Sequence, residues 1–441
     1  MRTDRARSAK AAIASVRGIG GPLLEAASMN LDMAVRTAIR GTRGWAGATN
    51  TDYDPADAAT AAQPFEAYRR LHDHGGRVFY NPRRATWILP GHEDVRAALR
   101  STDAVTSTRG VTRFMITAPM LVLSDGAEHT RLRRQVQPAF TRGAMAAWQS
   151  AIDTLAEELV ADVVTGRACD AVARLAVPLP IRIIARILGV PETDGPQFRR
   201  WSEDGVGFVN AAATPAGVAQ TVTAIRAIRS LRGYFSRQFA SGVFTASDTV
   251  LGRLLEYNEG GELDEDGLFF IALLLLFAGN ETTTNLIGGM IDTLAHRPDV
   301  FDALRADPEL IPAAVEEQLR FTSPIQNLYR YTRAPHEVGT VTIPTGSRVL
   351  MSFGAANRDP RVFDDPDTYR VDRDPRTHIA FGYGPHMCVG AILARMEAQA
   401  VLRQLTRQAA AITPAGPTTW STHSSLRGPV HLPVRLIPAT G

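Results

Sequence analysis

The sequence predicts a mainly α-helical protein with a small β portion. Stretches with apolar residues at three- and four-residue spacing recur along the chain, as in helices that bury one face. Strand-like stretches are short, and turn residues such as Pro344-Thr345-Gly346 separate them. With 45% apolar and 21% charged residues, the 441-residue chain has a globular composition. The expected helices include 63–73, 129–140, 144–164, 181–188 and 224–239, and the expected strands are 78–80, 86–89, 341–343, 348–353 and 430–436.

Residues 1–50 differ from the rest of the chain in charge and periodicity. They are basic, rich in alanine and glycine, and only weakly periodic. We expect an N-terminal extension over residues 1–50, although an arginine-rich leader of this kind also has the composition of a transit peptide. From residue 51 onward the pattern is continuous, with neither a linker nor a repeat. We therefore expect a single domain over residues 51–441.

Charge and cysteine content exclude several classes of protein. The formal net charge of +3 is small for this length and gives no reason to expect nucleic-acid binding. The two cysteines, Cys169 and Cys388, exclude a disulfide framework or a four-cysteine metal site and fit a reducing compartment. No secretory signal is visible, and the longest apolar run, 268–278, is shorter than the about 18 residues that a membrane span needs. We expect a cytoplasmic protein without a membrane span.

The longest expected helix covers residues 264–297. Acidic residues at 264–266 favour the positive end of a helix dipole, and Pro298 follows the last helical residue. Such a helix would be about 50 Å long. Because it is apolar on all sides for several turns, we expect it to cross the middle of the molecule.

Residues 381–390, hereafter the cysteine loop, give the sharpest functional signal with the sequence Phe-Gly-Tyr-Gly-Pro-His-Met-Cys-Val-Gly. Three glycines and a proline indicate a tight loop whose backbone approaches another group closely. A helical pattern resumes at Ala391, so Cys388 lies where a loop enters a helix, and N–H groups there stabilise a thiolate. A glycine-lined thiolate beside Phe381 suits the binding of a flat iron macrocycle. A lone cysteine is more often a small buried hydrophobe, but the ten-residue pattern favours the iron site.

The cysteine loop resembles, position for position, the haem-binding signature Phe-Gly-x-Gly-x-His-x-Cys-x-Gly of the cytochrome P450 family. The resemblance covers about residues 51–441 and implies the cytochrome P450 fold as a single haem domain. It implies haem b with Cys388 as the iron ligand, held by further loop residues: Phe381, Gly382, His386 and Gly390. Thiolate ligation favours O–O bond cleavage. The resemblance therefore implies a haem-thiolate monooxygenase that inserts one oxygen atom of O2 into a small apolar organic substrate.

A second motif stands inside the long helix, Ala278-Gly279-Asn280-Glu281-Thr282-Thr283-Thr284. Glycine, an acid and three threonines form helix poorly, and a threonine hydroxyl can bond a backbone carbonyl and leave a local notch. Such kinks are also common packing features of buried helices. The motif resembles the family's Ala/Gly-Gly-x-Asp/Glu-Thr. The resemblance implies that Thr282 donates a hydrogen bond to dioxygen and that Glu281 helps to relay protons.

Glu317 and Arg320 lie three residues apart, on one face of an expected helix. As a bare pair they are typical of a solvated surface contact. They resemble the family's buried Glu-x-x-Arg pair, which an arginine upstream of the cysteine loop joins. Arg373 is the candidate for that third member, and Arg370 is the alternative. The resemblance implies a structural triad that holds the segment carrying Cys388.

The two propionates of a haem need cationic partners. His129 and Arg133 lie one helical turn apart and project from one face. A basic exposed helix face is the ordinary interpretation of such a pair, but the two residues resemble the family's His-x-x-x-Arg clamp. The resemblance adds His386 from the cysteine loop and Arg330, with Arg333 as the alternative to Arg330.

The resemblance also implies where substrate and electron donor bind. The expected substrate contacts are mostly apolar, and each can equally be core: Leu274, Phe277, Ala278, Ile325 and Leu328, the segments 109–121, 208–214 and 422–426, and Gln326 and Asn327 as polar contacts. A positive patch from Arg131, Arg134 and Arg395 on the Cys388 side would steer an acidic electron donor. No glycine-rich dinucleotide motif follows a strand. We therefore expect electrons from a ferredoxin and an NAD(P)H-dependent ferredoxin reductase.

Three other interpretations stay open. A haem-thiolate protein could bind or sense a small ligand without turnover, but the acid–alcohol pair of Glu281 and Thr282 argues against this. An enzyme that uses peroxide directly, or that catalyses an isomerisation, would need no external electrons, although such family members tend to have altered relay residues. A zinc site from Cys388, His386 and His378 would have poor geometry and no fourth ligand.

Overall fold

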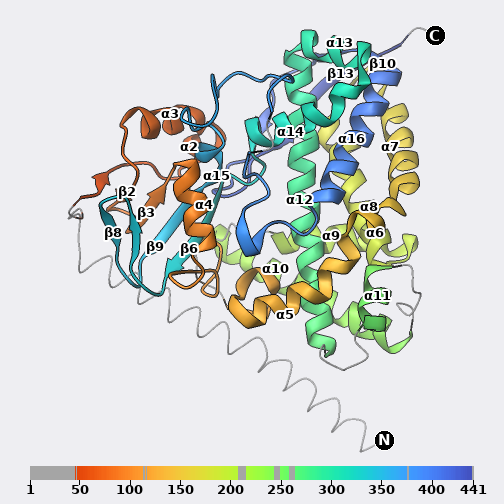
Figure 1. Ribbon diagram of the computed structural model, residues 1–441. Coiled ribbons are helices and arrows are strands. Elements are labelled where there is room, and N and C mark those ends of the chain that lie inside the picture. Colours follow the sequence, from red (N-terminus) through yellow and green to blue (C-terminus); the bar gives the residue numbers. More distant parts are fainter. Residues whose placement is uncertain are drawn as a thin grey trace, which may run out of the picture.

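The computed structural model describes residues 45, 47–112, 115, 117–206, 215–242, 249–257, 264–374 and 377–439. This part of the chain forms a large helical region and a smaller strand-rich region that lie side by side (Figure 1). The expectation of a mainly α-helical fold with a small β portion is confirmed. The expected substrate segment 208–214 and part of 109–121 lie outside the described residues.

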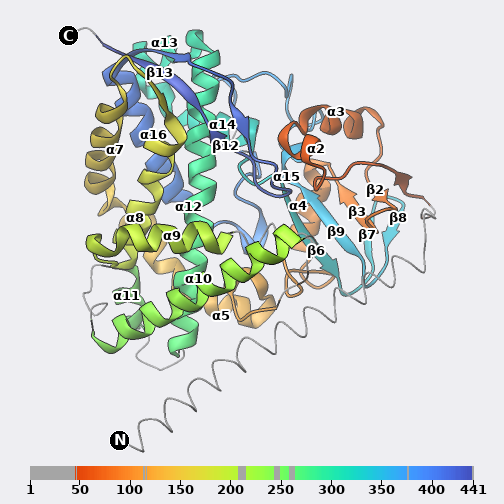
Figure 2. The same ribbon diagram turned by 180° about the vertical axis from the view of Figure 1, so that it is seen from behind.

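The helical region is built around α12 (Glu265–His296), which runs through its middle in both views (Figures 1 and 2). Asp264 accepts a hydrogen bond from the Gly267 amide, and Pro298 begins the next helix, so both ends lie within one residue of the expected bounds. Neighbouring helices are α7 (Gln149–Val163), α8 (Pro178–Leu188), α9 (Gly195–Val206), α10 (Pro215–Ala240), α11 (Val250–Tyr257), α13 (Pro298–Ala306), α14 (Ile311–Thr322) and α16 (Ala391–Gln408).

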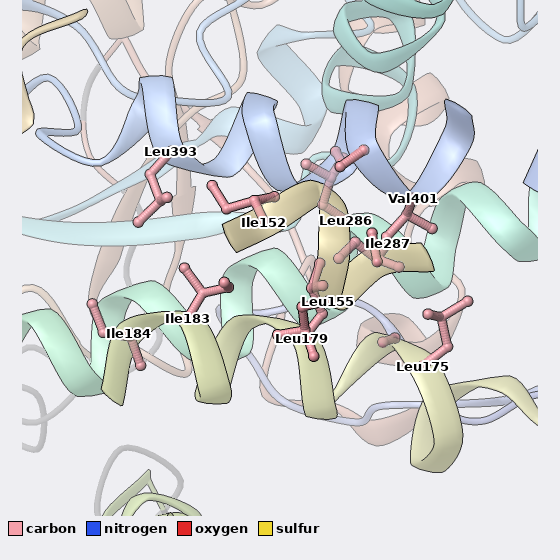
Figure 3. Packing of buried hydrophobic residues seen from close by; sticks show 14 of the residues in the cluster. Ile152, Leu155, Leu175, Leu179, Ile183, Ile184, Leu286, Ile287, Leu393 and Val401 are labelled. Carbon is pink, nitrogen blue, oxygen red and sulfur yellow. The ribbon is translucent and has the colours of Figure 1, made fainter. Parts of the chain in front are cut away.

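The main hydrophobic core lies where α12 meets α7, α8 and α16 (Figure 3). Ile152 of α7, Ile183 of α8, Leu286 of α12 and Val401 of α16 are almost fully buried there. Burial of one such side chain stabilises the fold by roughly 1.5–3 kcal/mol. The core therefore fixes α16, which follows the cysteine loop directly, against α12.

By length and composition alone, α12 could cross a membrane. In the folded chain, 56% of its most apolar 18-residue window is buried inside the protein. Its apolar surface is largely covered by other helices, as expected for the central helix of a large core. Within the described residues, α12 alone passes this test.

A six-stranded mixed sheet forms most of the strand-rich region, in the order β1-β2-β3-β9-β6-β4. Its strands are β1 (Thr49–Asn50), β2 (Phe79–Asn81), β3 (Thr86–Leu89), β4 (Val105–Thr106), β6 (Asn327–Thr332) and β9 (Arg348–Ser352). β3 pairs parallel with β9, and β6 pairs antiparallel with β9. Strands β3 and β9 match the expected ranges to within one residue, whereas β6 was not expected as a strand.

Shorter elements complete the fold. The remaining strands form small sheets: β7 (His336–Val338) with β8 (Val341–Ile343), β11 (Thr419–Trp420) with β12 (Pro429–His431), and β13 (Pro433–Pro438) between β10 (Ala409–Pro414) and β5 (Ala168–Asp170). The remaining helices are α2 (Ala58–Ala62), α3 (Phe65–Asp73), α4 (His92–Arg100), α5 (Gly126–Val136), α6 (Arg142–Ala146) and α15 (Phe353–Ala356).

The edge of the sheet begins inside the expected N-terminal extension. β1 pairs parallel with β2, and the ring of Trp45 lies 5.4 Å from that of Trp87 and 6.3 Å from that of Tyr80. The last residues of the range 1–50 therefore contribute to the folded sheet. Residues 1–44 lie outside the described part of the chain.

Candidate active site

The cysteine loop leads into α16 and contains two strained turns that require glycine. Gly382 and Gly384 have φ angles of +76° and +71°, a region that residues with side chains rarely adopt. A Cβ atom on Gly384 would also lie 3.1 Å from the Leu99 carbonyl at the end of α4. The Cys388 amide donates to the Phe381 carbonyl at 2.8 Å. This bond closes the loop and fixes where the sulfur lies.

Cys388 is reachable by solvent although protein surrounds it. Its side chain is exposed, yet burial raises the pKa of its thiol. The side chain is thus surrounded by protein without being tightly packed against it. The Gly390 amide and the charges of Arg133 and Arg395 act in the opposite direction and favour the thiolate. These are suitable surroundings for a thiolate that binds a metal ion.

Of the expected arginines, Arg133 contacts the cysteine loop and Arg330 is buried in the sheet. Arg133 of α5 donates to the Met387 carbonyl at 2.7 Å. Arg330 of β6 is 4% exposed, and burial lowers its pKa to about 10. Its guanidinium donates to the Tyr329 carbonyl, and no carboxylate pairs with it among the described residues. Arg333 is instead 45% exposed and donates to surface carbonyls, so the buried arginine of the two is Arg330.

His129 lies buried beside His386, with 4.2 Å between the two ring centroids. The Nε2 atom of His129 has no hydrogen-bond partner among the described residues. Burial lowers the pKa of His129 to about 4, and His386 and Arg133 act in the same direction. A buried polar atom without a partner is costly, and nearby cations favour an anion as its partner. This environment suits a carboxylate.

Asp125, which we did not identify from the sequence, lies at the centre of this cluster. Its Oδ1 accepts hydrogen bonds from His386 Nε2 at 2.9 Å and from the Ser107 hydroxyl at 2.9 Å. Burial opposes ionisation, but these bonds and those from Thr106 and the Ser107 amide hold the pKa of Asp125 far below its usual range. Asp125 precedes α5 at the N-cap position but makes no capping bond. That position was the available signal, and it predicts a cap rather than a partner for His386.

A stripe of accessible residues runs along the middle of the otherwise buried α12. It consists of Leu274, Phe277, Ala278, Glu281 and Thr282. Their spacing places them on one face of the helix. Ala278 is exposed and the other four are half-buried, while most of the surrounding helix is buried. The stripe is therefore the accessible face of an otherwise buried stretch, as expected for the face that meets dioxygen and substrate.

The hydroxyl of Thr282 donates to the Ala278 carbonyl at 2.7 Å, the type of bond that the sequence predicted. The expected notch is wrong, because α12 continues without interruption across this motif. Burial raises the pKa of the Glu281 carboxyl to about 7. Near neutral pH this side chain is therefore present in both its protonated and ionised forms.

Glu317 and Arg320 form a fully buried ion pair in α14. Arg320 donates to both carboxylate oxygens of Glu317, at 2.7 and 2.8 Å. Arg373 Nε lies 3.4 Å from Glu317 Oε1, whereas the side chain of Arg370 pairs with Asp372. The structure thus brings Arg373, rather than Arg370, to the pair. Arg320 and Arg373 also donate to carbonyls between residues 357 and 368, which fixes the segment before the cysteine loop.

The two expected polar substrate contacts are wrong, because both side chains are fully used in packing. Gln326 accepts a hydrogen bond from the Tyr68 hydroxyl at 2.6 Å, and Asn327 accepts one from Tyr53 at 3.3 Å. Each is 3% exposed or less. Ile325 and Leu328 are half-buried, and a β-bridge joins Ile325 to Leu426. The expected segments 325–328 and 422–426 therefore touch each other.

The expected positive patch is weaker than predicted. Arg395 pairs with Glu316 and is 32% exposed, and Arg131 pairs with Glu128, which leaves Arg134 as an exposed cation. The zinc interpretation fails for a related reason. His386 bonds Asp125 and His378 bonds Glu316, so the two histidines do not converge with Cys388.

Together these residues fit a flat iron macrocycle with two carboxylates. Cys388 offers a thiolate beside tight glycine turns, and the unpartnered His129 and the buried Arg330 offer partners for anionic groups. The accessible stripe of α12 offers an apolar face that ends in an acid and an alcohol. Haem bound there would supply oxygen activation, and the protein would supply orientation, protons and exclusion of water.

The known proteins that this chain resembles all belong to one family. A family model described as Cytochrome P450 matches residues 241–408. The chain is 42% identical over 424 residues to the beta-dihydromenaquinone-9 omega-hydroxylase of Mycobacterium tuberculosis, which covers 96% of this chain and 86% of that protein. It is 34% identical to the 6-deoxyerythronolide B hydroxylase of Saccharopolyspora erythraea, over 79% of this chain and 90% of that protein. CYP109E1 from Bacillus megaterium in complex with corticosterone has a TM-score of 0.77 at 31% identity, over 86% of this chain and 99% of that chain. This chain therefore belongs to the cytochrome P450 family and is a haem monooxygenase.

Proposed function

We propose that this enzyme hydroxylates an apolar organic substrate with electrons from a ferredoxin and an NAD(P)H-dependent ferredoxin reductase. The observation that carries the proposal is the accessible stripe of α12, in which the apolar Leu274, Phe277 and Ala278 lead into Glu281 and Thr282. An apolar surface that ends in an acid and an alcohol suits an apolar substrate held beside a source of protons. A cytoplasmic location accords with the two free thiols.

We propose a role for each residue around the cofactor. Cys388 is the iron ligand of haem b, and Phe381, Gly382 and Gly390 shape the loop against the macrocycle. His129, Arg133, Arg330 and His386 bind the propionates, because they are the basic groups gathered beside the loop. Glu317, Arg320 and Arg373 hold the preceding segment and take no part in the chemistry.

Proton delivery is assigned to Glu281 and Thr282. Because the Thr282 hydroxyl donates to the Ala278 carbonyl, its oxygen remains free to accept a hydrogen bond from a water molecule that carries protons. A carboxyl whose pKa is about 7 can give up and regain a proton near neutral pH. The pair argues against a sensor without turnover and against an enzyme that draws only on peroxide.

Three apolar scaffolds are candidate substrates: an isoprenoid quinone, a steroid and a macrolide. The relative named for dihydromenaquinone matches 96% of this chain, against 79% for the relative named for a macrolide precursor. We therefore propose an isoprenoid quinone, oxidised near the end of its chain, ahead of a steroid or a macrolide. The ferric iron's spin-state shift on adding each compound would rank them, and a shift with the steroid alone would contradict this order.

The test of the reaction is Thr282→Ala. We expect NADH consumption to continue with a surrogate ferredoxin system while product falls and hydrogen peroxide rises, because the hydroxyl that guides protons is lost. The ratio of product to NADH is the measurement. Thr293→Ala, on the same helix but beyond the accessible stripe, is the control and should keep the wild-type ratio. An unchanged ratio in Thr282→Ala would contradict the assignment.

A further inference from the structure

Helix α14 presents two consecutive acids to two different sets of partners. Glu317 lies in the buried pair with Arg320, while Glu316 turns to residues beside the cysteine loop. Arg395 donates to both Glu316 oxygens, at 2.5 Å from Nε and 2.8 Å from Nη2. His378 Nε2 lies 3.1 Å from Glu316 Oε2. One carboxylate therefore accepts three hydrogen bonds.

The two partners of Glu316 stand on either side of the cysteine loop in the sequence. His378 precedes Phe381, and Arg395 follows in the first turns of α16. Glu316 therefore joins the beginning of the loop to the helix after it, like a clasp across its base. The His378 side chain is 3% exposed and that of Glu316 is 18% exposed, so water competes little for these bonds.

The tautomer of His378 makes the clasp independent of a charged imidazole. Its Nδ1 accepts a hydrogen bond from the Ala380 amide at 3.2 Å, so the ring proton is on Nε2 and points to Glu316. Burial alone would raise the pKa of Glu316, but the bonds from Arg395 and His378 lower it to about 2. The carboxylate is therefore ionised at neutral pH.

Arg395 connects the clasp to the sulfur. Its guanidinium lies 4.4 Å from the centre of the Phe381 ring, and the Phe381 carbonyl accepts the Cys388 amide. Holding Arg395 in place thus fixes the shape of the loop around the sulfur.

We propose that Glu316 is a positioning residue for the iron-binding thiolate, acting through Arg395 and His378. The inference rests on the proposed ligation of haem by Cys388, and it assigns Arg395 to the thiolate rather than to a docking patch. Without the carboxylate, the base of the loop loses its clasp and Arg395 loses its anchor. The sulfur is then held less firmly, and a haem bound there would lose part of its thiolate ligation.

The experiment compares the reduced carbon monoxide spectra of purified holoenzyme variants. In Glu316→Gln and Arg395→Gln, we expect the ratio of the neutral-sulfur band to the thiolate band to rise by at least about tenfold, the scale of one charge-assisted hydrogen bond. The double variant should rise no further than either single variant, because both remove the same contact. Glu309→Gln and Arg407→Lys, at exposed positions near α14 and on α16, should match the wild type.

A second control separates positioning from general loss of stability. Val401→Ala removes core packing from α16 without touching the loop, and it should lower the unfolding temperature while keeping the thiolate band. The inference is overturned if Glu316→Gln keeps the wild-type ratio, or if Val401→Ala changes it equally. If the wild type itself shows no thiolate band, the proposed ligation by Cys388 fails instead.

Discussion

At the level of single residues, the fold gives two chemically identical side chains very different pKa values. Glu281 and Glu316 have the same intrinsic acidity, and both are partly buried. Burial acts alone on Glu281 and raises its pKa to about 7, whereas Arg395 and His378 overcome the burial of Glu316 and lower its pKa to about 2. The result is one carboxyl that can exchange protons near neutral pH and one that is ionised there.

The pKa of Glu281 predicts the pH dependence of turnover. Below about pH 7 its carboxyl holds a proton to give, and above that pH the ionised form prevails. We expect the rate of product formation to fall as the pH rises through this value. Glu281→Gln should lower the rate by about a hundredfold or more and flatten the profile, because the amide does not titrate. Steady-state rates with excess electron donor measure this, and a variant with the wild-type profile would refute it.

At the level of elements, α16 contributes both to the candidate site and to the hydrophobic core. It begins after the cysteine loop, carries Arg395, and packs Leu393 and Val401 into the main core (Figure 3). Glu397 lies on the same helix face between these two, and its Oε2 has no hydrogen-bond partner among the described residues. A buried carboxyl in apolar surroundings favours its neutral form.

Glu397 should make the stability of the enzyme depend on pH. Burial raises its pKa to about 8, well above the value of about 4.5 in an unfolded chain, so the folded state keeps a proton that the unfolded state releases. The free energy of unfolding therefore falls as the pH rises between these values, by at most about 1.4 kcal/mol per unit. Glu397→Gln should remove this slope and be more stable than the wild type at alkaline pH. Urea unfolding at several pH values measures it, and equal slopes in both proteins would exclude this role.

Local signals in the sequence predicted some elements well and others not at all. The bounds of α12 were predicted to within a residue, because Asp264 marks its start, Pro298 follows its end and an apolar run lies between them. β6 was missed, because polar residues such as Asn327 and Arg330 interrupt its apolar pattern although both are buried. The contacts of Asp125 with His386, and of Glu316 with Arg395, join remote segments and leave no local pattern. The triad of Glu317 was anticipated from the family resemblance rather than from spacing.

On the scale of the whole molecule, one sheet extends from the N-terminal edge strand β1 to β6, which belongs to the candidate site. The sheet starts at β1, beside Trp45, and its inner strand β6 carries Arg330, a proposed partner of the cofactor. We propose that residues 1–50 are an extension to a haem domain that spans residues 51–441. The aromatic packing of Trp45 adds the last residues of this extension to the edge of the sheet.

Two truncated proteins would show which N-terminal residues stabilise the fold. A chain that starts at Trp45 should melt like the full-length protein, because it keeps β1 and the contacts with Trp87 and Tyr80. A chain that starts at Asp52 loses them, and its unfolding temperature should fall by roughly 2–4 °C for each kcal/mol lost. Thermal unfolding followed by circular dichroism distinguishes the two. Equal melting of both truncated proteins would mean that β1 contributes nothing measurable.

The proposed cofactor contacts come from α5, from β6 and from the cysteine loop, which are remote from one another along the chain. Haem would therefore bind only the native arrangement of these three segments. A ligand that binds the native state alone shifts the folding equilibrium, by about 4 kcal/mol at a thousandfold excess over its dissociation constant. The amount of intact enzyme in a cell would then follow its haem supply, and newly made chains short of iron porphyrin would be the ones that proteases remove.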